Sequence, residues 1–296
     1  MSLTINNNLM AMNAARNLGN SYNNLSTSVR RLSSGLRVGQ ASDDAAGLAI
    51  RELMRADITA LNQGVRNAND AISLIQTADG ALGIIDEKLI RMKELAEQAA
   101  TGTYNSDQRL MIESEYQAMA SEITRIANST DFNGVHLLNG NLSSGTHNGT
   151  GLTSTGKMKI HFGSGNDSAE DYYYVQIGNS TASALGVGNS ANALSAGYTV
   201  STQAAAQNAL EGLSAAITSK DKIRAHLGAL QNRLENTISN LQIQAENLQA
   251  AESRISDVDV SLEMTNFVRN QILTQAAVSM LSQANSLPQM ALSLIG

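Results

Sequence analysis

Apolar residues recur along most of the chain at steps of three and four, the spacing that places them on one face of an α-helix. In the N-terminal part these steps predict a helix with a narrow apolar stripe made of Leu18, Tyr22, Leu25, Val29, Leu32 and Leu36. After a glycine-rich break, a seven-residue repeat predicts a long second helix with a seam of Leu61, Ala68, Ile75, Leu82, Leu89 and Ala96. We interpret Ser106 as the N-cap of a third helix.

The second half of the chain carries the clearest heptad repeat. It predicts a helix over about residues 203–255, and its positions are Leu227, Leu234, Leu241, Leu248, Ile255 and Leu262. A last helix is expected on the row Leu273, Met280, Leu287 and Leu294. The eleven-residue step from Leu262 to Leu273 marks a change of register and hence of packing partner. The single proline, Pro288, lies inside this last row and predicts a kink or a new helix start.

Residues 139–195, between the helical halves, are rich in Gly, Ser, Asn and Thr. Two alternating runs, KMKIHF at 157–162 and YYYVQI at 172–177, predict short strands, and the Asn-Gly pairs at 133–134 and 139–140 indicate tight turns. The expected fold class is therefore mainly α. We predict a long antiparallel helical bundle or coiled-coil rod formed by the N- and C-terminal halves, with a small β-hairpin-rich tip.

Composition narrows the class of protein further. The 296 residues include no Cys, no Trp and one Pro, and aromatic residues make up 3%, so the apolar surface is aliphatic and cysteine-based sites are excluded. A formal net charge of −6 is unlike the basic surface of a nucleic-acid-binding domain. Residues 1–15 and 270–296 carry no charged side chain, yet polar residues interrupt every apolar run below membrane-spanning length. The N-terminus lacks the pattern of a Sec-type signal peptide.

Candidate catalytic chemistry is nearly absent from the sequence. No nucleophile, phosphate-loop or dinucleotide motif occurs, and the histidines lack metal-ligand spacing: His136, His147, His161 and His226. Asp43 and Asp44 precede an apolar helix start, so we interpret them as capping residues and not as an acid–base pair. We therefore predict a protein that is not an enzyme, with no catalytic residues, no metal and no cofactor.

The uncharged ends favour self-assembly. A helix that packs on the body of its own chain needs one apolar face, and its opposite face normally carries charge. Charge is missing around the whole circumference of the last predicted helix, which indicates neighbours on several sides. Two ordinary terminal helices packed on the body of a monomer remain the alternative.

Four stretches closely resemble bacterial flagellin, and together they lie in both helical halves. They are LSTSVRRLSSGLRVGQASDDAAGLAI at 25–50, DFNGVHLL at 131–138, RAHLGALQNRLENTISNL at 224–241, and the C-terminal run from ESRISDVDVSLEM at 252–264 to LPQMALSLI at 287–295. The resemblance implies a structural subunit that assembles into the flagellar filament for swimming motility. It implies a secreted, extracellular protein of the bacterial flagellum, delivered by the flagellar type III export apparatus with an export chaperone.

The resemblance also implies a domain organisation and a set of partners. Residues 1–40 and 256–296 are expected to be terminal filament-core helices, 41–138 and 198–255 rod-domain helices, and 139–197 the β-rich tip of the rod domain. The remaining loop stretches are too short for a large variable outer domain, so none is expected. The expected partners are copies of the same chain, the filament cap and hook-associated proteins, with no nucleic acid and no membrane insertion.

Three sets of residues are candidates for these roles. Core-domain packing is expected from Leu18, Tyr22, Leu25, Val29, Leu32, Leu273, Met280, Leu287 and Leu294. The rod-domain seam is expected from Leu61, Ile75, Leu82, Leu89, Leu227, Leu234, Leu241 and Leu248. By resemblance, Arg91, Leu95 and Glu115 match a patch that the flagellin-sensing Toll-like receptor recognises. The alternative for this patch is two solvated helix charges and one seam residue.

Two other classes of protein remain open. A hook–filament junction protein shares similar ends and is a structural adaptor, but RVGQASDDAAGLAI and QNRLENTISNL favour the filament subunit. An enzyme carried in a flagellin insert is the other class. The missing metal-binding motif and the shortness of the insert argue against it.

Overall fold

The computed structural model describes residues 7–147, 156–188 and 199–295, with the side chains of all of these except residue 288 and residues 291–295. Its helices are α1 (Leu9–Ser34), α2 (Ala45–Ala100), α3 (Ser106–Ser129), α4 (Gln203–Ser256) and α5 (Val260–Ile295). Its strands are β1 (Asp131–Phe132), β2 (Val135–His136), β3 (Met158–His161) and β4 (Tyr172–Val175). The fold class expected from the sequence is confirmed.

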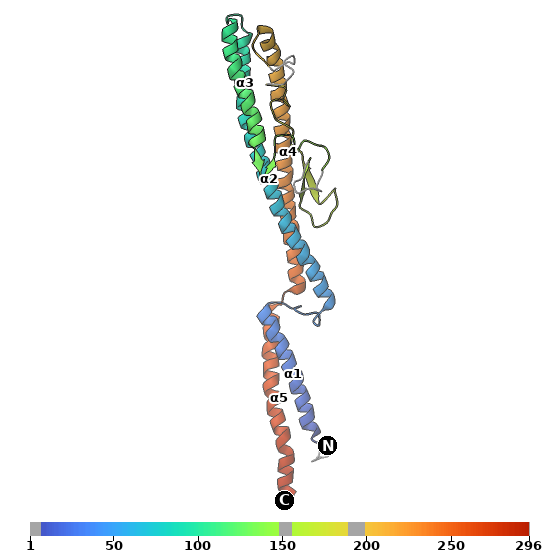
Figure 1. Ribbon diagram of the computed structural model, residues 1–296. Coiled ribbons are helices and arrows are strands. Elements are labelled where there is room, and N and C mark those ends of the chain that lie inside the picture. Colours follow the sequence, from blue (N-terminus) through green and yellow to red (C-terminus); the bar gives the residue numbers. More distant parts are fainter. Residues whose placement is uncertain (1–6, 148–155, 189–198, 296) are drawn as a thin grey trace. The chain divides into compact units, whose positions relative to one another are not determined.

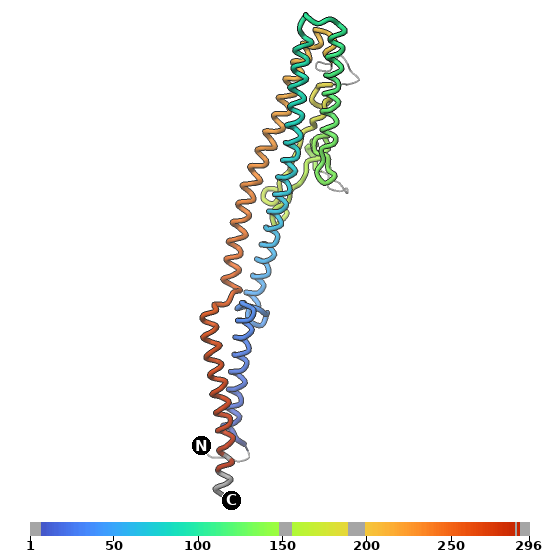
Figure 2. The backbone as a smooth tube through the Cα atoms, turned by 90° about the vertical axis from the view of Figure 1, so that its left-hand side faces the viewer, coloured from blue at the N-terminus to red at the C-terminus, as the bar shows by residue number. Residues whose placement is uncertain are grey.

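The chain divides into two compact units. The terminal unit comprises the described residues of 1–58 and 246–296, and the rod unit comprises those of 59–245. In the terminal unit α1 and α5 lie side by side, as Figures 1 and 2 both show. In the rod unit α2, α3 and α4 run alongside one another.

The rod unit has one continuous hydrophobic core. Side chains from all three of its helices and from the β-rich segment contribute to this core. Among the largest that are fully buried are Leu82, Ile85, Leu89 and Met92 of α2, Tyr116 and Ile123 of α3, and Leu137 and Leu142 beyond α3. Each helix of this unit therefore has neighbours that cover its apolar face.

Two ion pairs fix the antiparallel alignment of α2 and α4. Arg224 Nε lies 2.7 Å from Asp79 Oδ1, and Lys220 Nζ lies 2.5 Å from Asp86 Oδ1. Residue numbers rise along α2 as they fall along α4, which is the antiparallel arrangement predicted for the two halves. The hydrogen bond from Arg224 holds the pKa of the Asp79 carboxyl below its ordinary value. The Lys220 side chain is buried, so its ammonium depends on its two carboxylate partners, Asp86 and Asp221.

The predicted rod-domain seam lies largely inside this core. Seven of its positions are buried: Leu61, Ile75, Leu82, Leu89, Leu227, Leu234 and Leu241. Leu248, the last position, is half-buried and belongs to the terminal unit. The heptad rows thus point toward neighbouring helices over most of their length.

Two antiparallel strand pairs follow α3. In the first, β1 and β2 are joined by Asn133 and Gly134, whose positive φ values of 53° and 79° explain the Asn-Gly pair. In the second, β3 pairs with β4 over four residues. Residues 148–155 and 189–198 of the expected β-rich tip lie outside the described residues.

The structure adds where the β3–β4 hairpin lies along the helices. Asn67 Nδ2 of α2 donates to the His161 carbonyl at 2.8 Å, and the Arg233 guanidinium of α4 lies 3.6 Å from the centre of the Tyr173 ring. A side chain at Gly64 would overlap the Phe162 carbonyl, so glycine permits this close approach. The hairpin therefore lies against the flank of α2 and α4, as Figure 1 shows, and not beyond their ends.

Three local predictions need correction. The N-cap of α3 is Asn105 and not Ser106, because Asn105 and Gln108 exchange side-chain and backbone hydrogen bonds in a capping box. Leu262 belongs to α5 and not to the α4 heptad, because the chain leaves the helix between Ser256 and Val260. No helix starts at Pro288, since α5 is continuous there.

We predict that Leu89→Ala lowers the free energy of unfolding of the purified chain by about 2 to 5 kcal/mol, because it leaves a cavity in the fully buried core. Ile90→Ala is the matched control, since the neighbouring Ile90 is 49% exposed on the same helix. Its cost is expected to stay below about 1 kcal/mol. Urea unfolding followed by circular dichroism measures both, and equal costs would show that the seam is not the core.

Candidate assembly surface

Helix α1 is defined by a cap at each end. At its start the Asn8 side chain accepts a hydrogen bond from the Ala11 backbone N–H at 3.0 Å. At its end Gly35 adopts a left-handed conformation with φ of 71° and donates its N–H to the Arg31 carbonyl at 2.9 Å. Glycine suits this position because a side chain is strained at such a φ.

Helix α5 runs antiparallel to α1, and polar contacts tie the two helices near both ends of α1. Near one end, Arg31 Nη1 lies 3.8 Å from Glu263 Oε2 in the first turn of α5. Near the other, Asn8 Nδ2 donates to the Ala284 carbonyl at 2.7 Å. The two contacts lie at opposite ends of α1, so together they set the register of α1 against α5.

The hydrogen bond from Asn8 to the Ala284 carbonyl replaces one that Pro288 removes from α5. In an α-helix the carbonyl of residue 284 normally accepts the N–H of residue 288, and proline has no N–H. The amide of Asn8 supplies a donor to this carbonyl from the other helix. Because Ala284 is buried, a carbonyl without a partner there would be costly. A continuous α5 is therefore compatible with Pro288.

The segment between α1 and α2, residues 35–44, is held by backbone hydrogen bonds to the end of α4 and to the link between α4 and α5. The Arg37 N–H donates to the Ser256 carbonyl at 2.7 Å, and the Val258 N–H donates to the Gly35 carbonyl at 3.0 Å. Leu36 and Asp257 form an isolated antiparallel bridge. Within the terminal unit, the connecting segment thus binds the N-terminal part of the chain to the link between α4 and α5.

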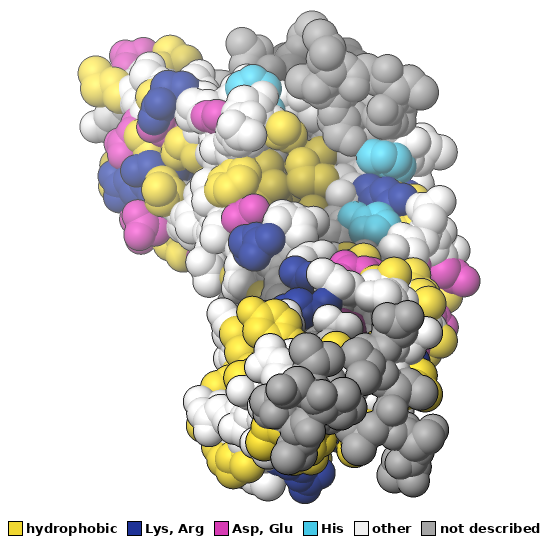
Figure 3. Space-filling model, turned by 90° about the horizontal axis from the view of Figure 1, so that it is seen from below, with side chains coloured by type: hydrophobic (Ala, Val, Ile, Leu, Met, Phe, Trp, Pro, Cys, Tyr) yellow, Lys and Arg dark blue, Asp and Glu magenta, His cyan; other side chains and the backbone are white. Residues whose placement is uncertain are grey.

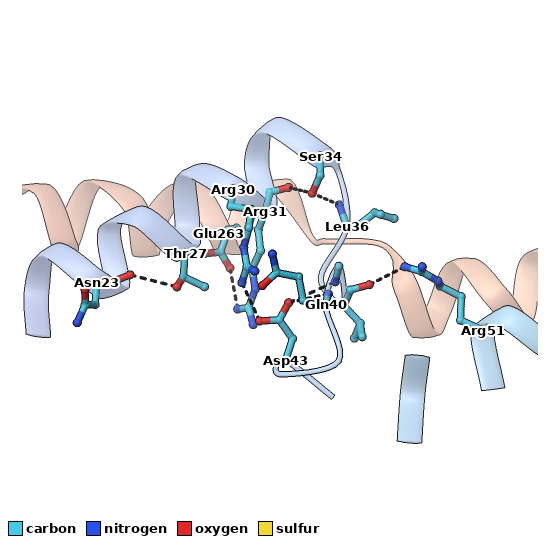
Figure 4. A network of polar contacts seen from close by, with 12 residues as sticks. Asn23, Thr27, Arg30, Arg31, Ser34, Leu36, Gln40, Asp43, Arg51 and Glu263 are labelled. Atoms are coloured by element: carbon cyan, nitrogen blue, oxygen red, sulfur yellow. Dashed lines mark hydrogen bonds and ion pairs between the residues drawn. The ribbon is translucent and has the colours of Figure 1, made fainter. Parts of the chain in front are cut away.

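Arginine side chains complete the polar contacts of the connecting segment (Figure 4). The buried Arg51 donates from Nη1 to the Val38 carbonyl at 2.6 Å, and Arg30 Nη2 lies 2.7 Å from Asp43 Oδ1. Burial raises the pKa of the Asp43 carboxyl, but hydrogen bonds from Arg30 and two backbone N–H groups outweigh it and lower the pKa overall. Asp44 accepts from the Gly47 N–H at 2.9 Å and caps α2.

The sequence reasoning did not identify the role of these arginines. Hydrophobic periodicity carries no information about which cation reaches which carbonyl. The signal that could have found them is the crowding of seven arginines between Arg16 and Arg66, in a stretch without lysine. Arginine presents several donors in a fixed planar fork, so it suits irregular backbone that needs more than one partner.

The residues predicted to pack the filament core are incompletely buried in this chain. Leu18, Leu25, Leu32 and Leu287 are half-buried, whereas Tyr22, Val29, Leu273 and Met280 are exposed. The side chain of Leu294 lies outside the described residues. Large exposed hydrophobic side chains are concentrated in the terminal unit, and the hydrophobic residues buried in its described part are Val38 and Ala284. Figure 3 shows such side chains at the surface beside uncharged polar groups.

Two grooves run between α1 and α5. The larger has a volume of about 670 Å³ and its lining is uncharged: Met10, Asn13, Ala14, Asn17, Asn20, Ser21, Asn24, Leu273, Ala276, Ala277, Met280, Gln283, Ala284 and Leu287. The second has a volume of about 510 Å³ and uses a different face of α1, with Ala15, Leu18, Gly19, Tyr22, Asn23, Thr274 and Val278. Both are open surfaces of apolar and amide groups, suited to receive another helix.

The residues predicted for receptor recognition are brought together on α2 and α3. Arg91 Nε and Nη2 lie 2.9 and 2.8 Å from Glu115 Oε1, and Arg91 Nη1 lies 2.9 Å from Glu94 Oε2. The hydrogen bond that Arg91 donates to Glu115 is the main reason that the pKa of the Arg91 guanidinium is raised. Leu95 is 1% exposed, so it belongs to the core of the rod unit and offers almost no surface of its own.

The described part of the chain contains no candidate metal cluster and no candidate membrane span. Over those residues no group of three or more His, Asp or Glu side chains could hold a metal ion. No helix among them is both long and apolar enough to cross a membrane.

Comparison with known proteins gives matches at both ends of the chain. Residues 5–143 match the model of the bacterial flagellin N-terminal helical region, and residues 210–295 match that of the C-terminal helical region. The chain is 41% identical over 293 residues to the flagellar filament 33 kDa core protein of Treponema phagedenis, covering 99% of this chain and 100% of that one. It is 40% identical to a flagellin of Halalkalibacterium halodurans, with the same coverage of both chains.

Two solved structures are also similar. The crystal structure of Bacillus cereus flagellin aligns with a TM-score of 0.46 at 30% identity, over 63% of this chain and 94% of that one. A putative flagellar hook-associated protein from Vibrio parahaemolyticus aligns with a TM-score of 0.54 at 13% identity, over 73% of this chain and 100% of that one. The second likeness concerns the fold alone.

We predict that Asn8→Ser weakens the α1/α5 pair, because serine keeps the cap on α1 but cannot reach the Ala284 carbonyl. Amide protons of residues 276–287 should exchange with solvent about two to ten times faster, as expected for one lost hydrogen bond. Exchange followed by mass spectrometry measures this.

The control is the same substitution in a Pro288→Ala background. Alanine at position 288 restores the backbone N–H that the Ala284 carbonyl accepts in a regular helix, so Asn8→Ser should then have a much smaller effect. An equal effect in both backgrounds would show that Asn8 does not compensate for the proline.

Proposed function

The chain belongs to the bacterial flagellin family and is a structural subunit of the flagellar filament, and we propose that subunits join through the exposed surface of the α1/α5 pair. The observation that carries this proposal is the concentration of exposed, uncharged apolar side chains on that pair. In the same proposal residues 1–40 and 256–296 form the filament core, and residues 41–138 and 198–255 form the rod domain.

The amount of exposed apolar surface supports burial by neighbours. Leu9, Met12, Ile272, Leu273 and Val278 are each about half exposed or more in the isolated chain. Burying a side chain of this kind contributes about 1.5 to 3 kcal/mol. Several such side chains on each subunit provide a driving force for association that one helix pair cannot realise alone.

The absence of charge lowers the cost of that burial. Residues 1–15 and 270–296 have no charged side chain, so most of the surface of the pair loses no ion hydration when a neighbour covers it. Asn, Ser and Gln side chains line the grooves instead and can form hydrogen bonds across an interface. Such a surface suits a protein neighbour better than lipid, where amides would lack partners.

The hook–filament junction remains the alternative within the same class. The likeness to the hook-associated structure from Vibrio parahaemolyticus is one of fold at 13% identity, whereas the relatives at about 40% identity over the full chain are named flagellins or filament core proteins. The filament subunit is therefore the better-supported function. Growth of long filaments by the purified chain distinguishes the two.

The remaining partners follow from the proposal. A subunit that polymerises through its ends must be kept unpolymerised before export, which the export chaperone and the type III export apparatus would accomplish. Outside the cell it would meet the filament cap and hook-associated proteins. We infer an extracellular location on these grounds. A structural role gives no reason to expect catalysis.

We predict that Leu273→Glu raises the critical concentration for polymerisation by about a hundredfold or more, because it places an unpaired carboxylate in a groove that a neighbour covers. Light scattering and electron microscopy of the purified chain measure polymerisation.

Ala169→Glu adds the same charge in the exposed turn between β3 and β4 and is expected to polymerise as the wild type does. Circular dichroism checks that both variants fold. Equal polymerisation of the two variants would refute the proposed surface.

We also propose that the exposed Arg91–Glu115 pair is the part of this chain that the flagellin-sensing Toll-like receptor contacts. Both side chains are about half exposed and their guanidinium and carboxylate are held together. Leu95 would act by supporting α2 beneath them, because it is buried. The competing interpretation, a solvated ion pair with no receptor role, has the same geometry and is decided by experiment.

Arg91→Ala is expected to reduce receptor activation in a reporter cell assay by about tenfold or more, since a well-placed arginine at an interface commonly contributes at least 1 to 2 kcal/mol. Arg125→Ala on α3, which removes another exposed Arg–Glu pair, should leave potency unchanged. Unchanged potency of Arg91→Ala would assign the pair to the solvated surface.

A further inference from the structure

We propose that Met10 and Met280 form an oxidation site through which sulfoxide formation in the free subunit blocks polymerisation. This inference rests on the proposed function of the α1/α5 surface. It adds a chemical sensitivity that follows from which apolar side chains the groove presents.

Methionine carries all the side-chain sulfur of this protein, because the sequence has 11 Met and no Cys. The methionines differ sharply in exposure. Met92 lies in the core of the rod unit and is fully buried, whereas Met10 and Met280 are 51% and 65% exposed. A dissolved oxidant therefore reaches the thioethers of Met10 and Met280 before it reaches that of Met92.

Met10 and Met280 line the same groove from opposite helices. Met10 projects from α1 and Met280 from α5, and both belong to the uncharged lining of the 670 Å³ groove. The lining residues near Met280 on α5 are apolar apart from Gln283. A neighbour that fills this groove must make close contact with both thioethers.

Methionine suits such a surface because its unbranched side chain adapts to the shape of a partner. Oxidation removes this advantage. A sulfoxide is polar, and its oxygen needs a hydrogen-bond donor as a partner when it is buried. Covering it with apolar groups is therefore unfavourable. Two sulfoxides in one groove thus oppose the association that two thioethers favour.

The reaction needs a peroxide as the oxidant. The thioether sulfur attacks one oxygen of hydrogen peroxide, an S–O bond forms as the O–O bond breaks, and the released hydroxide takes the proton of the new S–OH group to give the sulfoxide and water. Sulfur loses two electrons and the peroxide gains two. Methionine sulfoxide reductase with a dithiol reverses the change.

The test begins with the wild-type chain in two states. Untreated monomer must polymerise, which tests the proposed function by itself. Monomer treated with hydrogen peroxide, with sulfoxides at residues 10 and 280 verified by peptide mass spectrometry, should show a critical concentration at least about tenfold higher. Repair by methionine sulfoxide reductase should restore it. Polymerisation of the doubly oxidised chain at the original critical concentration would overturn the inference.

Two variants locate the effect. The double variant Met10→Leu, Met280→Leu keeps the groove apolar, and peroxide treatment should raise its critical concentration by a clearly smaller factor than that of the wild type. Met111→Leu removes an exposed methionine of the rod unit, 72% exposed on α3, and should remain as sensitive as the wild type. Equal inhibition of the double variant by peroxide would place the sensitivity at other methionines and reject this site.

A competition experiment needs no substitution and covers the case in which the double variant fails to assemble. Partly oxidised wild-type chain is allowed to polymerise, and filaments are separated from the remaining monomer. Sulfoxide at residues 10 and 280 should be enriched in the monomer fraction, whereas sulfoxide at residue 111 should divide equally. Equal division at residues 10 and 280 would also overturn the inference.

Discussion

Two helices cannot cover each other's apolar surface, and much of this structure follows from that constraint. In the rod unit α2, α3, α4 and the β-rich segment surround one another, so side chains such as Leu82, Ile85 and Tyr116 lose all contact with water. In the terminal unit α1 has α5 as its main helical partner, and most of each circumference is left open. In the proposed assembly this surplus surface drives association, because other copies of the chain would complete its burial.

The distribution of charge in the terminal unit fits this constraint. Ions are placed where irregular backbone needs donors, as with Arg51 at the Val38 carbonyl and Arg30 at Asp43. One ion pair, Arg31 with Glu263, ties α1 to α5 near the connecting segment, and at the far end of α1 the contact is neutral, from the amide of Asn8 to the Ala284 carbonyl. The same chain thus uses strong polar contacts to shape the joint and keeps them away from the surface that neighbours would cover.

The rod unit uses charge differently. Lys220 is buried between the helices, with carboxylates of Asp86 and Asp221 at its ammonium. A buried pair of this kind adds little net stability, but a shift of α4 along α2 would separate the ammonium from Asp86, its partner on the other helix. Together with Arg224 and Asp79 it gives two long helices with similar heptad rows a single alignment.

The local spacing of apolar and charged residues was enough to predict the helices and the uncharged ends, and the matching layout of the two halves predicted their antiparallel pairing. The sequence also indicated the strand pairs through alternation and Asn-Gly turns. Only the folded structure shows that the β3–β4 hairpin lies on the flank of α2 and α4, that Leu95 is buried whereas Arg91 is exposed, and that Asn8 donates to the Ala284 carbonyl, for which Pro288 has no N–H. The physical reason is that periodicity gives the face on which a side chain lies, whereas hydrogen-bond partners and the covering of a surface depend on residues far away in the chain.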